Sequence, residues 1–217
     1  MNNKFIVANF KSYKTQSEAD KWLAEVKDFQ IPKGKEVIVC PPFTLLSFFK
    51  EFIVKNNLSM KLGAQDISPF EEGAYTGEVN GVQIKEFADY VLIGHSERRL
   101  NFNENEEILT KKVLQALENN LTPIFLIQGK ENIVPQGVSM VAYEPIFAIG
   151  SKTPDTPENA SDVAGLFKAK NNIEVLYGGS ISSQNVNSFT SKNNISGVLV
   201  GGASLEAGEF IEIINHA

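Results

Sequence analysis

Apolar positions along the chain follow two alternating patterns. Short continuous apolar runs alternate with longer segments whose apolar positions recur every three or four residues. Trp22, Val26 and Phe29 keep this helical period in one longer segment, and Leu109 and Val113 keep it in another. The short runs have the length of buried strands, and the longer segments have one apolar face, as surface helices do.

The apolar pattern predicts eight strands separated by helical segments. The expected strands are Phe5–Ala8, Glu36–Cys40, Lys61–Ala64, Tyr90–Ile93, Pro123–Ile127, Met140–Tyr143, Glu174–Tyr177 and Gly197–Val200. The expected helices are Ser17–Phe29, Leu45–Lys55, Val82–Phe87, Glu104–Asn119, Pro157–Lys170, Ser183–Thr190 and Leu205–Asn215.

This alternation indicates the fold class. Strands that alternate with helices favour a parallel sheet, and eight such units favour an α/β closed barrel of the (β/α)8 type, the TIM barrel. A doubly wound open sheet is the alternative, because a local pattern does not reveal whether a sheet closes. The chain has no linker, low-complexity segment or repeat, so residues 1–217 are expected to form a single barrel domain.

One connection departs from the alternation. Only residues 128–139 join the fifth and sixth strands, whereas a parallel crossover needs about a dozen residues even with a minimal helix. This segment also contains Gly129, Pro135 and Gly137, which disfavour a helix. The fifth helix is therefore expected to be shortened or missing, with Ile133 and Val138 partly exposed to water.

The composition limits the possible functions. The chain has 217 residues, a net charge of -6 and a pI near 5.1, which argues against a general nucleic-acid binder. A single cysteine, Cys40, suits a reducing cytoplasm, and two histidines leave little material for a zinc site. The start lacks the apolar core of a signal peptide, and no run reaches the ~18 apolar residues of a membrane helix.

An acid at the tip of a strand is the first candidate for chemistry. Glu144 follows the apolar run Met140–Tyr143 and precedes Pro145, which ends a strand and forbids a helix there. The next residues, 146–150, form an apolar loop, which is unusual at a surface unless the loop folds over something. An acid beneath such a loop suits proton abstraction in a site that can close.

Three further polar residues are expected at the same edge of the sheet. Asn9 and Lys11 follow the first strand, and His95 follows the fourth strand just before the acidic start of a short helix. Active groups of such barrels project from the carboxyl ends of strands. Taken alone, Asn9 and Lys11 fit a turn residue and a solvated cation better than an active site, whereas the place of His95 favours a neutral imidazole.

Two glycine pairs follow the last two strands. The motif Y-G-G-S ends at Ser180, and V-G-G-A-S-L contains Gly201 and Gly202. Paired glycines let backbone N–H groups approach an anion closely, and a following helix adds positive potential. Each pair alone fits an ordinary turn, but two pairs at consecutive strand ends favour a phosphate site.

Taken together, these motifs resemble the triosephosphate isomerase family from end to end. In the family's order, the chain contains A-N-F-K, G-A-Q-D, G-A-Y-T-G-E, G-H-S-E-R-R, A-Y-E-P-I-F-A-I-G, Y-G-G-S and G-G-A-S-L. Each motif is weak alone, and their joint occurrence is specific. Ala8, Phe10 and Phe147 stand where the family usually has glycine or tryptophan, and the lid tip is one glycine shorter.

The resemblance implies an aldose–ketose isomerase of glycolysis and gluconeogenesis that interconverts dihydroxyacetone phosphate and D-glyceraldehyde 3-phosphate without a metal or cofactor. It implies Glu144 as the base and His95 as the electrophile, with Glu97 as a supporting acid. The implied substrate contacts are Asn9, Lys11, Gly150, Ser180, Gly201 and Gly202.

The resemblance also implies how the lid and the assembly work. Tyr177 would hold the closed lid, and the loop Gly73–Glu78 would form a homodimer in which Thr76 reaches the partner's site. A bare patch beside residues 128–139 would permit a tetramer. No nucleic-acid or membrane partner is expected.

Two other functions fit the same barrel. Another phosphosugar isomerase would share the phosphate glycines but would not require Asn9, Lys11, His95 and Glu144 together. A catalytically silent barrel used for binding or assembly would be expected to have lost one of these residues, and none is lost.

Overall fold

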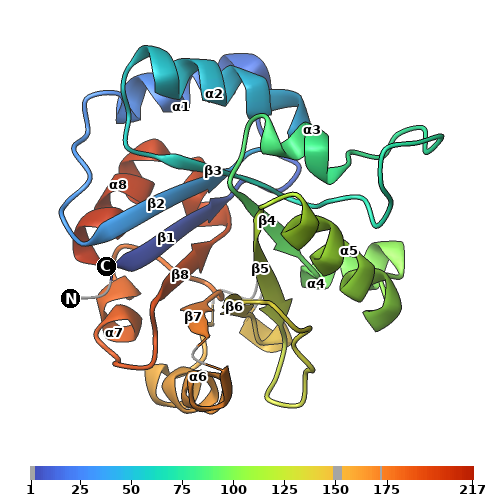
Figure 1. Cartoon of the computed structure of the whole chain (residues 1–217). Coiled ribbons are helices and arrows are strands. Elements are labelled where there is room, and N and C mark those ends of the chain that lie inside the picture. Colours follow the sequence, from blue (N-terminus) through green and yellow to red (C-terminus); the bar gives the residue numbers. More distant parts are fainter. Residues whose placement is uncertain (1–2, 149–152, 172) are drawn as a thin grey trace.

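The computed structural model describes residues 3–148, 153–171 and 173–217, and its eight strands close into a parallel barrel in the order of the sequence (Figure 1). The barrel predicted from the sequence is therefore confirmed, and the open sheet is excluded. The strands are β1 (Lys4–Asn9), β2 (Lys35–Cys40), β3 (Lys61–Ala64), β4 (Tyr90–Ile93), β5 (Thr122–Ile127), β6 (Met140–Tyr143), β7 (Glu174–Tyr177) and β8 (Gly197–Val200).

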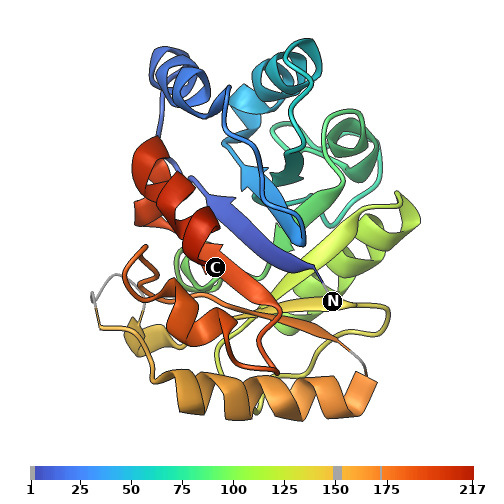
Figure 2. The same cartoon turned by 90° about the vertical axis from the view of Figure 1, so that its left-hand side faces the viewer.

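The helices lie outside the barrel, as Figure 2 shows for α6 and α8. They are α1 (Gln16–Val26), α2 (Leu46–Lys55), α3 (Gly81–Lys85), α4 (Ser96–Phe102), α5 (Glu106–Glu118), α6 (Pro157–Asn171), α7 (Val186–Thr190) and α8 (Ala207–His216). Short 3-10 turns are η1 (Phe43–Leu45), η2 (Ile146–Ala148) and η3 (Gly202–Leu205). Within the described residues, no helix is both long and apolar enough to cross a membrane.

Helix starts follow from their caps. The Thr15 hydroxyl accepts from the Glu18 N–H while the Glu18 carboxylate accepts from the Thr15 N–H, so α1 begins at Gln16. Asn105 caps α5 in a similar way by accepting from the Ile108 N–H. The helix expected from Glu104 therefore begins later, at Glu106, and the Glu104 side chain is left for a buried ion pair.

Two apolar layers form the core. Side chains that point into the barrel, among them Val7, Leu92 and Leu176, form the inner layer. Side chains that point outward pack against the helices, and Phe10 joins this layer by packing edge-on against Trp22 and Phe49. Because both strand faces are covered, the strands are almost continuously apolar, which is the pattern that predicted them.

Residues 128–139, all of which the structure describes, connect β5 to β6 through turns and irregular chain without a helix. The expectation that the helix after the fifth strand is missing is confirmed; α4 and α5 both lie between β4 and β5. The expectation that Val138 is exposed is wrong, because its exposed fraction is 7% and it packs in the outer core layer. Ile133 is exposed at 80%, as expected, so the connection itself covers much of the gap.

Closure of the barrel depends on a glycine where β8 meets β1. Gly197 pairs with Phe5, and a Cβ atom at Gly197 would overlap the backbone carbonyl of Phe5. Backbone atoms in a strand cannot move aside without breaking the ladder, so a side chain is excluded at this position.

We expect Gly197→Ala to lower the free energy of unfolding by about 1–3 kcal/mol, the usual cost of forcing an extra methyl group into a packed site. Urea denaturation measures the change. Gly208→Ala is the matched control, because a Cβ atom there meets nothing within 4 Å and alanine favours a helix by up to about 1 kcal/mol. Equal stability of the two variants would contradict the close approach of β8 to β1.

Candidate active site

A cavity of about 760 Å³ opens at the carboxyl ends of the strands. Its lining includes Asn9 and Lys11 from the end of β1, Glu97 from α4 and Glu144 from the end of β6. The glycine turns after β7 and β8 complete the lining. Residues that are far apart in the sequence therefore meet at one rim, as expected for a barrel of parallel strands.

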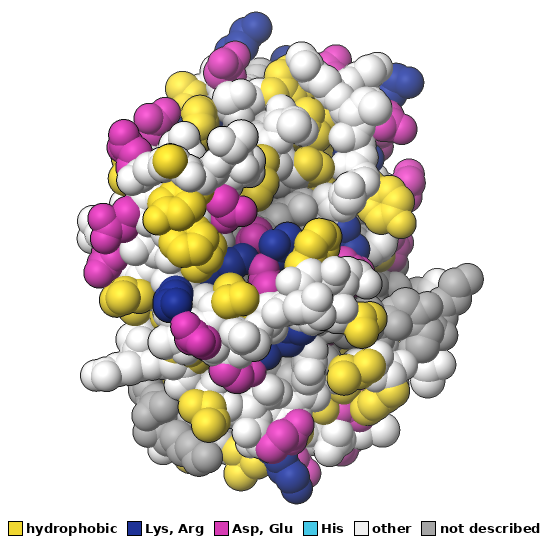
Figure 3. Space-filling view, turned by 90° about the vertical axis from the view of Figure 1, so that its right-hand side faces the viewer, with side chains coloured by type: hydrophobic (Ala, Val, Ile, Leu, Met, Phe, Trp, Pro, Cys, Tyr) yellow, Lys and Arg dark blue, Asp and Glu magenta, His cyan; other side chains and the backbone are white. Residues whose placement is uncertain are grey.

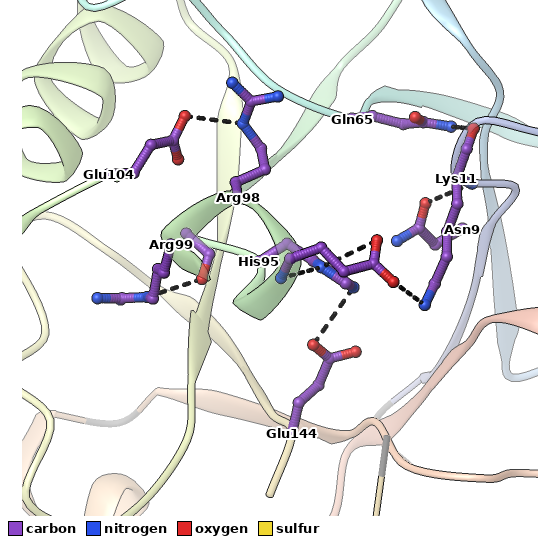
Figure 4. A network of polar contacts seen from close by, with 10 residues as sticks. Asn9, Lys11, Gln65, His95, Arg98, Arg99, Glu104 and Glu144 are labelled. Carbon is purple, nitrogen blue, oxygen red and sulfur yellow. Dashed lines mark hydrogen bonds and ion pairs between the residues drawn. The ribbon is translucent and has the colours of Figure 1, made fainter. Parts of the chain in front are cut away.

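Glu144 lies at the tip of β6 with its carboxylate directed into the cavity (Figure 4). Its backbone N–H donates to the Ile127 carbonyl, 2.8 Å away, which continues the pairing of β5 with β6. The residue is only 7% exposed. Burial raises the pKa of Glu144 to about 8, while the Lys11 ammonium acts in the opposite direction.

His95 caps the N-terminus of α4, and its ring is oriented by a backbone donor. The Glu97 N–H donates to Nδ1 over 3.2 Å, so Nδ1 carries no proton and the proton of the neutral ring lies on Nε2. His95 is 4% exposed, and this burial lowers its pKa to about 4 against the opposing Glu97 charge, with smaller lowering effects of Lys11 and Arg98. The imidazole is therefore neutral at neutral pH.

Beside the cavity, His95 Nε2 lies 3.5 Å from Glu144 Oε2. Both atoms are buried, and neither has a hydrogen-bond partner in the described part of the chain. Because the imidazole is neutral, the two groups do not form an ion pair. Buried polar atoms usually have partners, so this pair is prepared for a ligand that supplies them.

Lys11 has an unusual backbone conformation with φ at +51°. The Gln65 side chain at the end of β3 supports it by donating to the Lys11 carbonyl over 2.8 Å, and Asn9 Oδ1 accepts from the Lys11 N–H over 3.0 Å (Figure 4). The ammonium contacts Glu97 Oε1 at 2.6 Å. The cation is thus held beside His95 and Glu144, with Glu97 balancing its charge.

An ion-pair network anchors α4 behind the cavity. Arg98 contacts Asp66 and Glu104 at 2.7 Å each, and the buried Lys112 ammonium also contacts both acids. Beside it, Arg99 donates to the Gly94 carbonyl over 2.9 Å (Figure 4). These contacts hold the backbone on either side of His95.

The two glycine turns face the cavity, but different physical reasons explain why these positions are glycine. Gly201 and Gly202 line the cavity, and a Cβ atom at Gly202 would meet only open space. A Cβ atom at Gly178, in contrast, would lie 2.7 Å from Cγ of Glu144. That glycine is needed for close packing against the acid, which the sequence analysis did not predict. Ser180 lines the cavity and donates to the Ala148 carbonyl.

The other expected residues lie elsewhere. Gly150 lies outside the described residues. Thr76 is exposed on the loop after β3 and does not line the cavity of its own chain. Tyr177 points outward from the barrel, and its hydroxyl accepts from the Asp155 N–H over 2.7 Å.

Sequence reasoning gave no role to Gln65, Arg99 or Asp155. Gln65 could have been found, because it directly follows the third strand and so lies at the same rim as Asn9. Arg99 and Asp155 act through contacts between separate elements, which no local pattern reveals.

Chemically, the cavity combines an acid–base group of raised pKa, a neutral hydrogen-bond donor and a cation. These groups suit removal of a proton beside a carbonyl whose oxygen gains negative charge. The described residues contain no cluster of three or more His, Cys, Asp or Glu side chains that could hold a metal ion.

Comparisons with a family model and with individual known proteins point to the same family. The family model described as triosephosphate isomerase matches residues 4–217. Triosephosphate isomerase of Dictyoglomus thermophilum is 36% identical, with 99% of each chain covered, and that of Caldanaerobacter subterraneus subsp. tengcongensis is 38% identical over the full length of both chains. That of Trichodesmium erythraeum is 34% identical over the same extent. The chain therefore belongs to the triosephosphate isomerase family.

Proposed function

We propose that Glu144 is the catalytic base of this chain's isomerase reaction. As a member of the family, the chain is an enzyme that interconverts dihydroxyacetone phosphate and D-glyceraldehyde 3-phosphate. The observation that carries the role of Glu144 is its buried carboxylate, which lines the cavity and lies 3.5 Å from Nε2 of the neutral His95. A base of raised pKa is effective near neutral pH.

The proposed reaction proceeds through an enediolate. Glu144 takes a proton from the carbon beside the carbonyl, and the electrons of that bond move to the carbonyl oxygen. The Nε2–H of His95 and the ammonium of Lys11 stabilise this oxygen, whose charge grows as the proton leaves. The hydroxyl proton on that first carbon passes to the former carbonyl oxygen, a transfer that His95 Nε2 can mediate, and Glu144 returns its proton to the former carbonyl carbon as the new carbonyl forms on the first carbon. The carbonyl itself makes the proton acidic, so the chemistry requires no metal or organic cofactor.

The substrate phosphate is proposed to bind at the glycine turns. Gly201 and Gly202 precede or begin η3, where backbone N–H groups are available to an anion, and Ser180 lies on the neighbouring turn. Gly150 is proposed as a further phosphate contact from the family resemblance. Asn9 would contact the substrate, and Glu97 would hold Lys11 in place through their contact at 2.6 Å.

A coupled assay with purified protein and D-glyceraldehyde 3-phosphate tests this function. Turnover that requires Glu144 supports it. Turnover of only larger phosphosugars would favour another isomerase on the same barrel, and no turnover would favour a silent barrel.

We also propose a homodimer formed through residues 73–78. The loop after β3 projects from the barrel in Figure 1 and carries two exposed aromatic rings, Phe70 and Tyr75, stacked with centroids 4.2 Å apart. Figure 3 views the side from which it projects, where charged side chains gather in a central band among scattered hydrophobic ones. Exposed aromatic groups on a projecting loop are typical of a protein contact.

A tetramer is the alternative assembly. It would use the surface beside residues 128–139 as a second interface. Burial of Val138 reduces the bare apolar surface there, and Ile133 is the exposed large hydrophobic side chain of the connection. This favours the dimer.

Two further proposals concern the whole chain. Residues 1–217 are proposed to be a single (β/α)8 domain, since pairing of β8 with β1 joins the two ends of the described chain. A cytoplasmic location is proposed because Cys40 is the only cysteine, and reduced cysteines are usual there.

We expect Glu144→Asp to lower kcat by about 100-fold, because the shorter side chain withdraws the carboxylate by about 1 Å. KM should change little, since the proposed phosphate contacts lie on other turns. Steady-state kinetics measure both values. Glu107→Asp is the control, an exposed acid on α5 that should keep the wild-type rate. Full kcat in Glu144→Asp would show that another residue is the base.

We expect His95 to remain neutral throughout the range around pH 6.5 in which a free histidine titrates. Its lowered pKa reflects burial of the ring, which disfavours the charged form. NMR titration of 15N-labelled protein measures the charge. The chain has only two histidines, so His216→Gln leaves His95 as the one histidine whose ring signals must be assigned. An imidazolium that forms near pH 6.5 would contradict the assigned role.

We expect a mass of two chains by light scattering during size-exclusion chromatography at micromolar concentration. Thr76→Arg should shift the mass toward one chain, because a long charged group would be placed in the proposed interface. A mass of four chains would support the alternative assembly. A mass of one chain for the unmodified protein would reject the role of residues 73–78.

A further inference from the structure

Asp155 lies at the end of the loop that follows Glu144, directly before the cap of α6. Its exposed fraction is 9%, which is low for an acid, and no cation among the residues that the structure describes forms an ion pair with it. Oδ1 accepts from the Thr156 N–H over 2.8 Å. Oδ2 accepts from the side chain of Asn159, 2.6 Å away, and from the Tyr143 hydroxyl, 3.2 Å away. Within the described part of the chain, the donors to this carboxylate are therefore all neutral.

The backbone of Asp155 makes a second connection. Its N–H donates to the Tyr177 hydroxyl over 2.7 Å. Tyr143 and Tyr177 are the last residues of β6 and β7, and they are paired in the register of the sheet. One residue thus joins the two neighbouring tyrosines, through its side chain to one and its backbone to the other.

Both tyrosines occupy the outer core layer, whereas Glu144, which follows Tyr143, lines the cavity. Tyr143 precedes Glu144, and Tyr177 precedes Gly178, where a Cβ atom would lie 2.7 Å from Cγ of Glu144. The Gly178 N–H donates to the Tyr143 carbonyl over 2.8 Å. A shift of either tyrosine would therefore move the strand tip that carries the acid.

The rings themselves are firmly placed. Tyr177 stacks on Phe189 of α7 with centroids 4.1 Å apart, and Tyr143 lies 6.2 Å from Tyr177. Burial and the neighbouring Asp155 charge raise the pKa of Tyr143 to about 12, so its hydroxyl keeps the proton that it donates. The remaining freedom of Tyr143 is restricted by the Asp155 carboxylate.

We propose that Asp155 is a positioning residue for the isomerase reaction, which holds the paired tyrosines Tyr143 and Tyr177 and thereby keeps Glu144 in place on the inner side of the barrel. The inference rests on the proposed role of Glu144 as the base. Asp155 acts through contacts outside the cavity and is not a substrate ligand.

Kinetic measurements test the proposal. Asp155→Ala should lower kcat by about 10- to 100-fold, the range expected when a reacting group is misplaced by up to 1 Å, with little change in KM. Tyr143→Phe should also lower kcat. The double variant should be no slower than the slower single variant, because both substitutions remove the hydrogen bond between Tyr143 and Asp155. Asp155→Asn keeps one acceptor oxygen and should recover part of the rate.

Further readouts separate positioning from general stability. The pH at which kcat/KM falls should not shift, because the charges that change the pKa of Glu144 are Lys11 and Glu97. Amide exchange at Glu144 and Gly178 should accelerate in Asp155→Ala. Asp162→Asn, an exposed change on α6, is the control and should leave kcat and exchange unchanged.

Each outcome decides the inference. Unchanged kcat in Asp155→Ala, additive losses in the double variant, or unchanged exchange at Glu144 would overturn it. Glu144→Asp is assayed in parallel to distinguish the two proposals. If that variant loses its rate while Asp155→Ala keeps full activity, only the positioning role fails. If Glu144→Asp keeps full activity, the proposed base is wrong, and amide exchange still decides whether Asp155 holds the strand tip.

Discussion

Closed parallel pairing of the strands is the constraint on which the rest of this structure depends. Because β8 pairs with β1, every strand delivers its last residue to the same rim, and the side chains beyond it surround one cavity. The same closure covers both faces of each strand, so little polar surface remains inside except at that rim. The site is thus a direct consequence of how the core is buried.

The rim combines groups that are unfavourable to bury. Glu144 and His95 are both withdrawn from water, and their pKa values shift in opposite directions because burial disfavours the charge of each. Behind the site, Arg98 and Lys112 pair with two acids and hold α4. Removing one partner of such a buried network typically costs about 3–5 kcal/mol, so this support is strongly coupled to folding.

Strand positions could be predicted from sequence because each depends on a local apolar run, and the positions of Asn9, Lys11, His95 and Glu144 followed from the strand ends. Contacts between elements could not be predicted. The support that Gln65 gives to Lys11 and the packing of Gly178 against Glu144 depend on distances between the ends of different strands. Burial of Val138 was missed because an irregular segment has no period from which to infer its inner face.

The helix-free connection between β5 and β6 bears on how the chain folds. Entropy lost on closing a loop grows with its length, and this crossover is short for a parallel pair. The β5–β6 pair also forms a continuous four-residue register from Ile124 with Met140 to Ile127 with Tyr143. We therefore expect the β5–β6 pair to form early in folding. The strand end that carries Glu144 would then be paired with β5 before β8 pairs with β1.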